Sequence, residues 1–155
     1  MIKSGLLPYG DIKDIMDEND MTLSVNRVGR HQSYVAYTRV ASVKSPWFMG
    51  VKVGDIHVVP VSHGEGRLCV NDVKLNAIIQ NGQAATQYCD LSGNPTMHPY
   101  YNPNSSACAI EGLFSPDGRI FGKMGHSERS GKNVMKNVPG NKSQMIFTSG
   151  VRYFR

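Results

Sequence analysis

Long apolar runs are missing from this chain, which argues against an integral membrane protein. No stretch approaches the roughly 18 apolar residues that a membrane-spanning helix needs, and the apolar residues at 1–8 are too few and too interrupted for a signal peptide. Cysteine is also scarce, since Cys69, Cys89 and Cys108 form neither a CxxC pair nor a zinc-binding pattern. We therefore expect a cytoplasmic protein with reduced thiols, no metal site and no membrane partner.

Charged residues are few as well, at 19% of the chain, yet the net charge of +5 and the pI near 9.2 raise the question of nucleic-acid binding. The seventeen lysines and arginines are scattered from Lys3 to Arg155. The densest basic region, 119–142, contains no recognisable nucleic-acid-binding motif. Such a spread is typical of a solvated surface, so we expect no nucleic-acid partner.

Glycine and proline are plentiful, at 16 and 8 residues, and they divide the chain into short segments. Pro60 cannot donate to a ladder, so a strand that reaches it is expected to end or bulge there. Turns are expected at Gly29 and at Ser115-Pro116-Asp117-Gly118. Alternating and β-branched patterns predict strands at 22–25, 34–40, 56–61, 84–89, 110–114 and 120–124.

Helical patterns are fewer. Residues 73–81 have apolar positions at helical spacing, a polar cap before them and Gly82 after them. Residues 1–7 look like the end of a helix. A last helix is expected to begin near Ser143, with one apolar face made of Phe147, Val151 and Phe154. Strands mixed with sparse helices indicate an α/β fold in a single domain, residues 1–155.

Gly125-His126-Ser127-Glu128-Arg129 follows directly on the strand predicted at 120–124. A histidine at a strand end points into the loop region where open α/β sheets bind ligands. Glu128 can fix the tautomer of the His126 imidazole and stabilise the imidazolium that forms when it takes a proton. Such a pair needs a nucleophile to activate. The competing interpretation is a surface histidine beside a capping glutamate.

A second His-x-Glu pattern lies in Ser62-His63-Gly64-Glu65-Gly66-Arg67. Its glycines let backbone N–H groups approach a ligand, and its three charged or titratable side chains can hold polar groups. The same composition is common in ordinary tight turns. Spacing alone does not decide between the dyad of His63 and Glu65 and the dyad of His126 and Glu128.

No activated nucleophile is visible in the sequence. A reactive cysteine of an α/β enzyme usually lies on a sharp, glycine-flanked turn from strand to helix, which exposes its sulfur beside helix N–H donors. None of the three cysteines has glycine neighbours of this kind.

Ordered segments along nearly the whole chain match the pattern of one family. The segments include Lys3-Ser4-Gly5-Leu6-Leu7-Pro8-Tyr9-Gly10, Gly54-Asp55-Ile56-His57, Pro60-Val61-Ser62-His63-Gly64-Glu65-Gly66-Arg67, Ser115-Pro116-Asp117-Gly118-Arg119-Ile120 and Gly125-His126-Ser127-Glu128-Arg129. In this order they resemble the glutaminase domain of phosphoribosylformylglycinamidine synthase, a class I glutamine amidotransferase of purine biosynthesis.

The resemblance implies a flavodoxin-like α/β domain that hydrolyses glutamine with a Cys-His-Glu triad. By the family's His-x-Glu-Arg motif, it implies that His126 is the general base and acid and that Glu128 orients it. It places the loop of His63, Gly64, Glu65 and Arg67 near the glutamine pocket. The ammonia would pass to a synthetase part, on the same chain or a separate subunit, that uses ATP and magnesium to make formylglycinamidine ribonucleotide. No cofactor is expected in this chain itself.

The sequence departs from the family at its start. The family's nucleophilic cysteine precedes the segment that matches Ile2-Lys3-Ser4-Gly5-Leu6-Leu7, so the elbow and the early strands are expected to be missing. The chain then corresponds to the C-terminal portion of one glutaminase domain. Loss of the first strands of a parallel sheet would expose an edge and the apolar faces that they covered.

Two functional interpretations follow. The chain is either the triad-bearing part of a working amidotransferase, or a non-catalytic fragment that binds a separately encoded half. Met1 is correspondingly either an internal methionine of a longer protein or a true start.

We expect the isolated chain to release no glutamate from glutamine, because His126 has no thiol to activate and no glutamyl intermediate can form. A coupled glutamate assay with the purified chain measures this. Hydrolysis above the rate in buffer would show that a nucleophile is present within these 155 residues.

Overall fold

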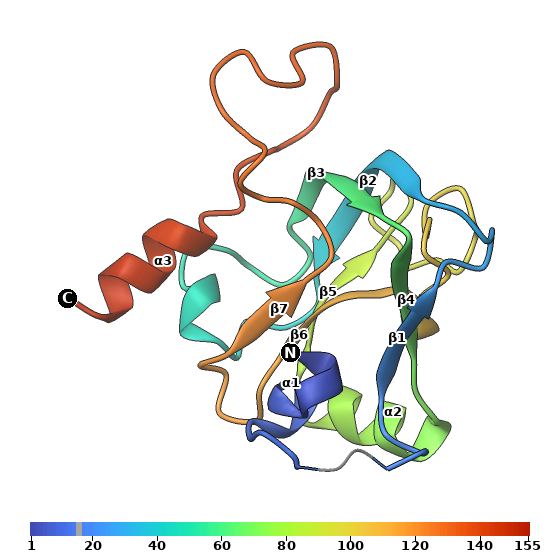
Figure 1. The fold of residues 1–155 in the computed structure, drawn as a ribbon. Helices are drawn as coiled ribbons and strands as arrows, with labels where there is room; N and C mark the ends of the chain where they lie inside the picture. The colour runs from blue at the N-terminus through green and yellow to red at the C-terminus, as the bar shows by residue number, and fades with distance from the viewer. Residues whose placement is uncertain (15–16) are drawn as a thin grey trace.

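One curled sheet dominates the computed structural model, which describes residues 1–14 and 17–155 (Figure 1). Within that part of the chain every strand pairing is antiparallel, unlike the parallel sheet that we expected. The mixture of strands and helices confirms the α/β class. In spatial order the sheet contains β3 (Ile56–His63), β2 (Gln32–Val40), β5 (Ala84–Tyr88), β6 (Ile110–Phe114) and β7 (Phe121–Lys123). These strands confirm the predicted ones, with ends that differ by one or two residues.

β3 runs through Pro60 to His63, so the prediction that the strand ends or bulges there is wrong. The reason is that β3 is an edge strand. Pro60 pairs with Val35 of β2 in regular register, and its missing N–H lies on the outer side, where the sheet requires no donor.

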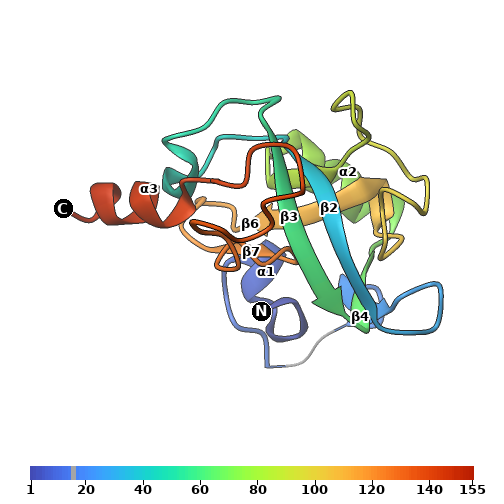
Figure 2. The same ribbon diagram turned by 90° about the horizontal axis from the view of Figure 1, so that it is seen from above.

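The outer edge of β3 is covered by the segment that follows β7. His126 donates its backbone N–H to the carbonyl of Pro60 at 2.8 Å, and Val58 donates to the carbonyl of Asn141 at 2.7 Å. β3 and β7 are opposite edges of the sheet, so these bonds require the sheet to curl until its two edges approach each other. The same segment then loops out beyond β3 before it reaches the last helix (Figures 1 and 2).

A separate ribbon is formed by β1 (Thr22–Val25) and β4 (Glu65–Cys69), which pair antiparallel. β1 is the strand predicted at 22–25. Gly29 makes the predicted turn, with a φ of +70° and an N–H bonded to the carbonyl of Asn26 at 2.8 Å. The turn does not close a hairpin, because β1 pairs with β4 and β2 belongs to the main sheet.

The helix α2 (Asp72–Gln80) confirms the clearest helical prediction, with the Asn71 side chain accepting from the N–H of Lys74. The helix predicted at 1–7 is replaced by two short turns, η1 (Ile2–Ser4) and α1 (Leu6–Tyr9). Gly5 interrupts them at a φ of +80°, a conformation that a continuous helix cannot contain. No helix of residues 1–14 and 17–155 is long and apolar enough to cross a bilayer.

The last helix, α3 (Ile146–Tyr153), begins three residues after the predicted start and turns its predicted apolar face outward. The face that packs is made of Ile146, Ser149 and Gly150, and it lies so close to Trp47 that a Cβ at Gly150 would be 2.3 Å from the Trp47 ring. The periodicity of the sequence predicts which residues share an apolar face of the helix, but not which face packs against the rest of the molecule. The exposed fractions are 63% for Phe147, 51% for Val151 and 71% for Phe154.

An aromatic cluster fills the sheet face beneath Trp47. Phe114 of β6 is fully buried, and its ring centroid lies 5.0 Å from that of Phe48 and 5.3 Å from that of Phe121. The ring of Phe48 meets Phe114 edge-on, an arrangement favoured by the aromatic quadrupole. The cluster fixes β6 and β7 relative to the segment that precedes β3.

Phe114→Ala should lower the free energy of unfolding by about 3–5 kcal/mol, because it removes a fully buried ring and leaves a cavity. Urea denaturation followed by circular dichroism measures the loss. The matched control is Phe147→Ala on the exposed face of α3, which should change stability by less than about 0.5 kcal/mol. Equal losses in the two variants would contradict the burial of the Phe114 ring.

Candidate functional site

The two His-x-Glu patterns meet in space although 63 positions separate their histidines. His63 closes β3 and His126 follows β7, and their ring centroids lie 5.9 Å apart. The hydrogen bond from the His126 backbone to Pro60 holds the loop at this end of β3. The curl of the sheet therefore assembles the site from segments that the sequence keeps apart.

His126 and Glu128 are in direct contact. The imidazole Nδ1 of His126 lies 2.7 Å from Oε1 of Glu128, and the imidazole is partly shielded from solvent, with 28% of its surface exposed. The backbone N–H of Glu128 itself, and then the imidazole, hold the pKa of the Glu128 carboxyl below its usual value. A carboxylate in this position can orient an imidazole and stabilise its protonated form.

His63 and Glu65 do not form the alternative dyad in the described structure. The Glu65 carboxylate is largely exposed and lies 3.9 Å from the ammonium of Lys3. Nδ1 of His63 is 3.3 Å from the backbone N–H of Ser62, and its buried Nε2 has no partner among the described residues. Burial, followed by the nearby His126, lowers the pKa of the His63 imidazole. The geometry thus favours the pair of His126 and Glu128.

The rest of the predicted glutamine-pocket loop turns away toward β1. The carbonyl of Gly64 accepts from the N–H of Asn26 at 2.9 Å, and Nη2 of Arg67 lies 3.3 Å from the hydroxyl of Ser24. Gly66 is required for packing, since a Cβ there would lie 2.6 Å from the amide of Asn104. Of the loop residues predicted from sequence, the described contacts bring only His63 next to His126.

A cavity of about 340 Å³ opens beside the pair of His126 and Glu128. Its polar wall is the segment Lys123–Glu128, and its apolar wall is made by β7 and by residues around Trp47 and α3. Its size lies at the lower end of the range for small-molecule sites, which usually combine apolar walls with a few polar groups. The arrangement is suited to a ligand of about the size of an amino acid.

No thiol lines this cavity among the described residues. Cys89 is fully buried, and burial raises the pKa of its thiol to about 11, so it is unsuited to act as a thiolate. Cys69 lies on β4 with its sulfur 3.7 Å from the carbonyl of Arg67, and Cys108 lies near the side-chain amide of Gln87. No cluster of three or more potential metal ligands occurs in residues 1–14 and 17–155.

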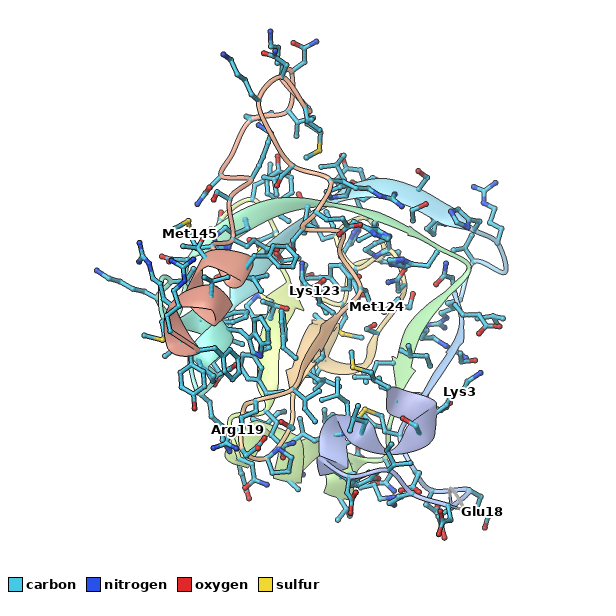
Figure 3. The ribbon with its side chains drawn as sticks, turned by 60° about the vertical axis from the view of Figure 1, so that its left-hand side comes forward. Lys3, Glu18, Arg119, Lys123, Met124 and Met145 are labelled. Carbon is cyan, nitrogen blue, oxygen red and sulfur yellow. The ribbon has the colours of Figure 1, made fainter. Side chains whose placement is uncertain are left out.

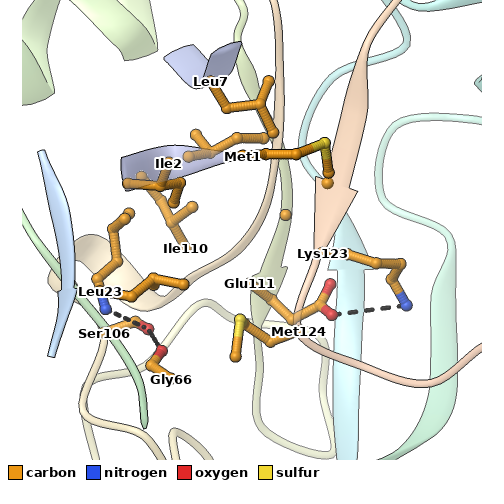
Figure 4. Close-up of a pocket in the computed structure, with 14 residues that line it drawn as sticks. Met1, Ile2, Leu7, Leu23, Gly66, Ser106, Ile110, Glu111, Lys123 and Met124 are labelled. Carbon is orange, nitrogen blue, oxygen red and sulfur yellow. Dashed lines mark hydrogen bonds and ion pairs between the residues drawn. The ribbon is translucent and has the colours of Figure 1, made fainter. Parts of the chain in front are cut away.

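Sequence reasoning missed a buried ionic pair behind the loop, formed by Glu111 of β6 and Lys123 of β7. Oε1 of Glu111 lies 3.5 Å from Nζ of Lys123 (Figure 4), and Figure 3 shows Lys123 and Met124 within the curve of the sheet. The Glu111 side chain is inaccessible and that of Lys123 is 10% exposed. A detectable signal was present, because Glu111 is a charged residue inside an otherwise apolar strand, Ile110–Phe114.

Comparison with known proteins places these features in a family. Residues 1–154 match the family described as CobB/CobQ-like glutamine amidotransferase domain. The chain is 29% identical over 153 residues to phosphoribosylformylglycinamidine synthase subunit PurQ of Symbiobacterium thermophilum, which covers 99% of this chain and 58% of the relative. The identity to the same subunit of Natronomonas pharaonis is 32% over 119 residues, or 75% of this chain and 52% of the relative.

A solved structure shows the same fold. The structure of PurLQS from Thermotoga maritima aligns with a TM-score of 0.64 at 21% identity, covering 88% of this chain and 54% of that chain. The chain therefore spans about half the length of the curated relatives that it matches.

The buried imidazole of His57 and the half-buried imidazole of His63 predict a loss of stability in mild acid. Burial lowers the pKa of both below the usual value near 6.5, so the unfolded chain takes up protons first as the pH falls. The free energy of unfolding should therefore be greatest above about pH 6.5 and decrease as the pH falls below that value.

Urea denaturation at several pH values measures this decrease. His63→Gln should make it smaller, whereas the matched change His98→Gln, at an exposed histidine, should leave it intact. A decrease of the same size in both variants would show that His63 does not contribute.

Proposed function

Because the chain belongs to the family of CobB/CobQ-like glutamine amidotransferase domains, we propose that it forms part of a glutaminase site in which His126 transfers protons. The single observation that carries the proposal is the 2.7 Å contact between His126 and Glu128 at the edge of a cavity of about 340 Å³. The chain is then the C-terminal portion of one glutaminase domain. Its proposed substrate is glutamine, which is hydrolysed to glutamate and ammonia.

The roles of the two side chains follow from the contact. Glu128 occupies Nδ1 of His126, which leaves Nε2 to accept a proton. In a complete site, Nε2 takes the proton of a cysteine thiol as the thiolate attacks the amide carbon of glutamine. The imidazolium then gives that proton to the leaving ammonia, and a water activated by the same nitrogen hydrolyses the glutamyl thioester. The cysteine must come from the part of the domain that this chain does not span.

The proposed partner is the synthetase part of phosphoribosylformylglycinamidine synthase. The curated relatives are named as subunits of that enzyme, and the similar solved structure is that of PurLQS from Thermotoga maritima. We propose that the ammonia serves the ATP- and magnesium-dependent conversion of formylglycinamide ribonucleotide to the amidine in purine biosynthesis. The nucleotide and metal sites would lie in the synthetase part, in the cytoplasm.

A second function is favoured by the absence of a thiol among the described residues of the cavity wall. In this alternative the chain is a non-catalytic fragment that binds a separately encoded half. The two functions predict different results when this chain is combined with a cysteine-bearing half. A catalytic chain restores glutamine hydrolysis that depends on His126, whereas a binding fragment restores association without hydrolysis.

The test uses a reconstituted full-length enzyme that contains this chain, the cysteine-bearing part and the synthetase part. His126→Ala should lower glutamine-dependent synthesis by about 10²–10⁴-fold, the usual contribution of a general acid–base, and should spare synthesis from added ammonia. His63→Ala is the matched comparison, because its ring lies beside His126 without the carboxylate. Loss of both activities in His126→Ala would indicate a structural role, and an ammonia-only phenotype confined to His63→Ala would assign the base to His63.

A further inference from the structure

The loop that carries His126 is tied to a network of buried polar groups. Both oxygens of the Glu111 carboxylate are used. Oε1 accepts from the backbone N–H of Gly125 at 2.5 Å, and Oε2 accepts from the hydroxyl of Thr86 at 2.5 Å. A buried carboxylate that accepts such bonds is an effective anchor for backbone N–H groups. Glu111 therefore fixes the residue that immediately precedes His126.

Lys123 fixes the residue that immediately follows His126. Its Nζ donates to the hydroxyl of Ser127 at 2.9 Å and to Oε1 of Gln144 at 2.8 Å, while it lies 3.5 Å from Glu111. The Ser127 hydroxyl also donates to the same oxygen of Gln144. One ammonium thus links the sheet interior, the His126 loop and the segment before α3.

The backbone of the loop has no room to shift toward the sheet. A Cβ on Gly125 would lie 2.4 Å from a methyl group of Val59 and 2.9 Å from the Glu111 carboxylate. The His126 N–H is bonded to the carbonyl of Pro60. His126 is therefore held by the bond of its own N–H and by the polar contacts of its two neighbours in the chain.

We infer that Lys123, supported by Glu111, is a positioning residue that holds the His126 imidazole against Glu128. The inference rests on the proposed function where it calls His126 the catalytic base, but the geometry that it predicts can be measured without catalysis. Lys123 acts through Ser127 and Glu111 and needs no contact with the reacting atoms.

The surroundings of Lys123 support this role. Lys123 and Met124 line both the His126 cavity and a second, apolar cavity of about 150 Å³ toward Met1 and Leu7 (Figure 4). Burial lowers the pKa of the Lys123 ammonium, and the nearby carboxylates of Glu111 and Glu128 oppose that shift. A lysine placed here only for solubility would reach solvent, whereas this one directs its ammonium at the loop.

The experiment is long-range ¹H–¹⁵N NMR of the histidine side chains in the chain as it is. In the neutral form of the wild-type His126 imidazole the proton should lie on Nδ1 alone, because Nδ1 donates to the Glu128 carboxylate. In Lys123→Met that preference should be lost, and the ¹⁵N shifts of the two ring nitrogens should move toward a common averaged value. Lys132→Met is the matched control at an exposed lysine of the same segment and should leave the tautomer unchanged.

Lys123→Met leaves the buried Glu111 carboxylate without its counter-ion, which destabilises the fold. A second variant therefore removes both charges. Glu111→Gln with Lys123→Met is neutral and retains a side-chain oxygen for the Gly125 N–H, while the link to Ser127 is absent. With amide resonances of β2 and β3 unchanged, this double variant should also lose the Nδ1 tautomer. A folded double variant with His126 still in a single Nδ1 tautomer would overturn the inference.

Ser127 offers an independent check on the same link. Ser127→Ala removes the hydroxyl that Lys123 contacts and should weaken the tautomer preference, whereas Ser127→Thr keeps the hydroxyl and should retain it. Equal spectra for the two variants would contradict a route through Ser127. None of these NMR measurements depends on glutamine hydrolysis. The positioning role is therefore tested separately from the proposed activity.

Discussion

Glu111 places a negative charge in the interior of the curled sheet, and several neighbouring elements are arranged to compensate it. Removing a carboxylate from water is costly unless it gains an opposite charge and hydrogen bonds. β5 provides the Thr86 hydroxyl, β7 provides the Lys123 ammonium, and the following loop provides the N–H of Gly125. Glycine at position 112 belongs to the same arrangement, because a Cβ there would lie 2.6 Å from the Thr86 hydroxyl. Compensation of one charge thus sets the relative positions of three strands and a loop.

The same compensation determines where the functional groups lie. Thr86 of β5 and Lys123 of β7 lie on one side of the sheet, while His63 and Pro60 belong to β3 at the edge opposite β7. Gly125 bridges the two, since it is in contact with Glu111 on one side and with Val59 on the other. The cavity beside His126 is therefore a product of sheet curvature as much as of the His-x-Glu motif.

Local signals in the sequence predicted most of the strands and α2, because alternation, the Asn71 cap and Gly82 act over a few residues. The errors have tertiary causes. Pro60 is compatible with a strand once that strand lies at an edge, and α3 packs through Gly150 because Trp47 occupies the space beside it. Spacing left the pair of His126 and Glu128 and the pair of His63 and Glu65 as alternatives, and only the family resemblance favoured the first. The approach of His63 to His126 depends on the curl of the sheet and was not predictable from the sequence. The network around Lys123 depends on pairing between β6 and β7 and could be inferred only in part from the polar residue inside β6. The catalytic roles themselves remain predictions.

The segment 126–141 covers β3 and thereby affects both the shape of the site and the tendency of the protein to associate. An uncovered edge strand presents free N–H and C=O groups to other chains, and β3 carries the buried valines Val58, Val59 and Val61 beside that edge. The bonds of Pro60 and Val58 to this segment occupy the edge from within the molecule. Without these two bonds, the carbonyl of Pro60 and the N–H of Val58 would be free to pair with a strand of a second molecule. The bonds that hold the His126 loop on β3 therefore protect the protein from association at the same time as they shape the site.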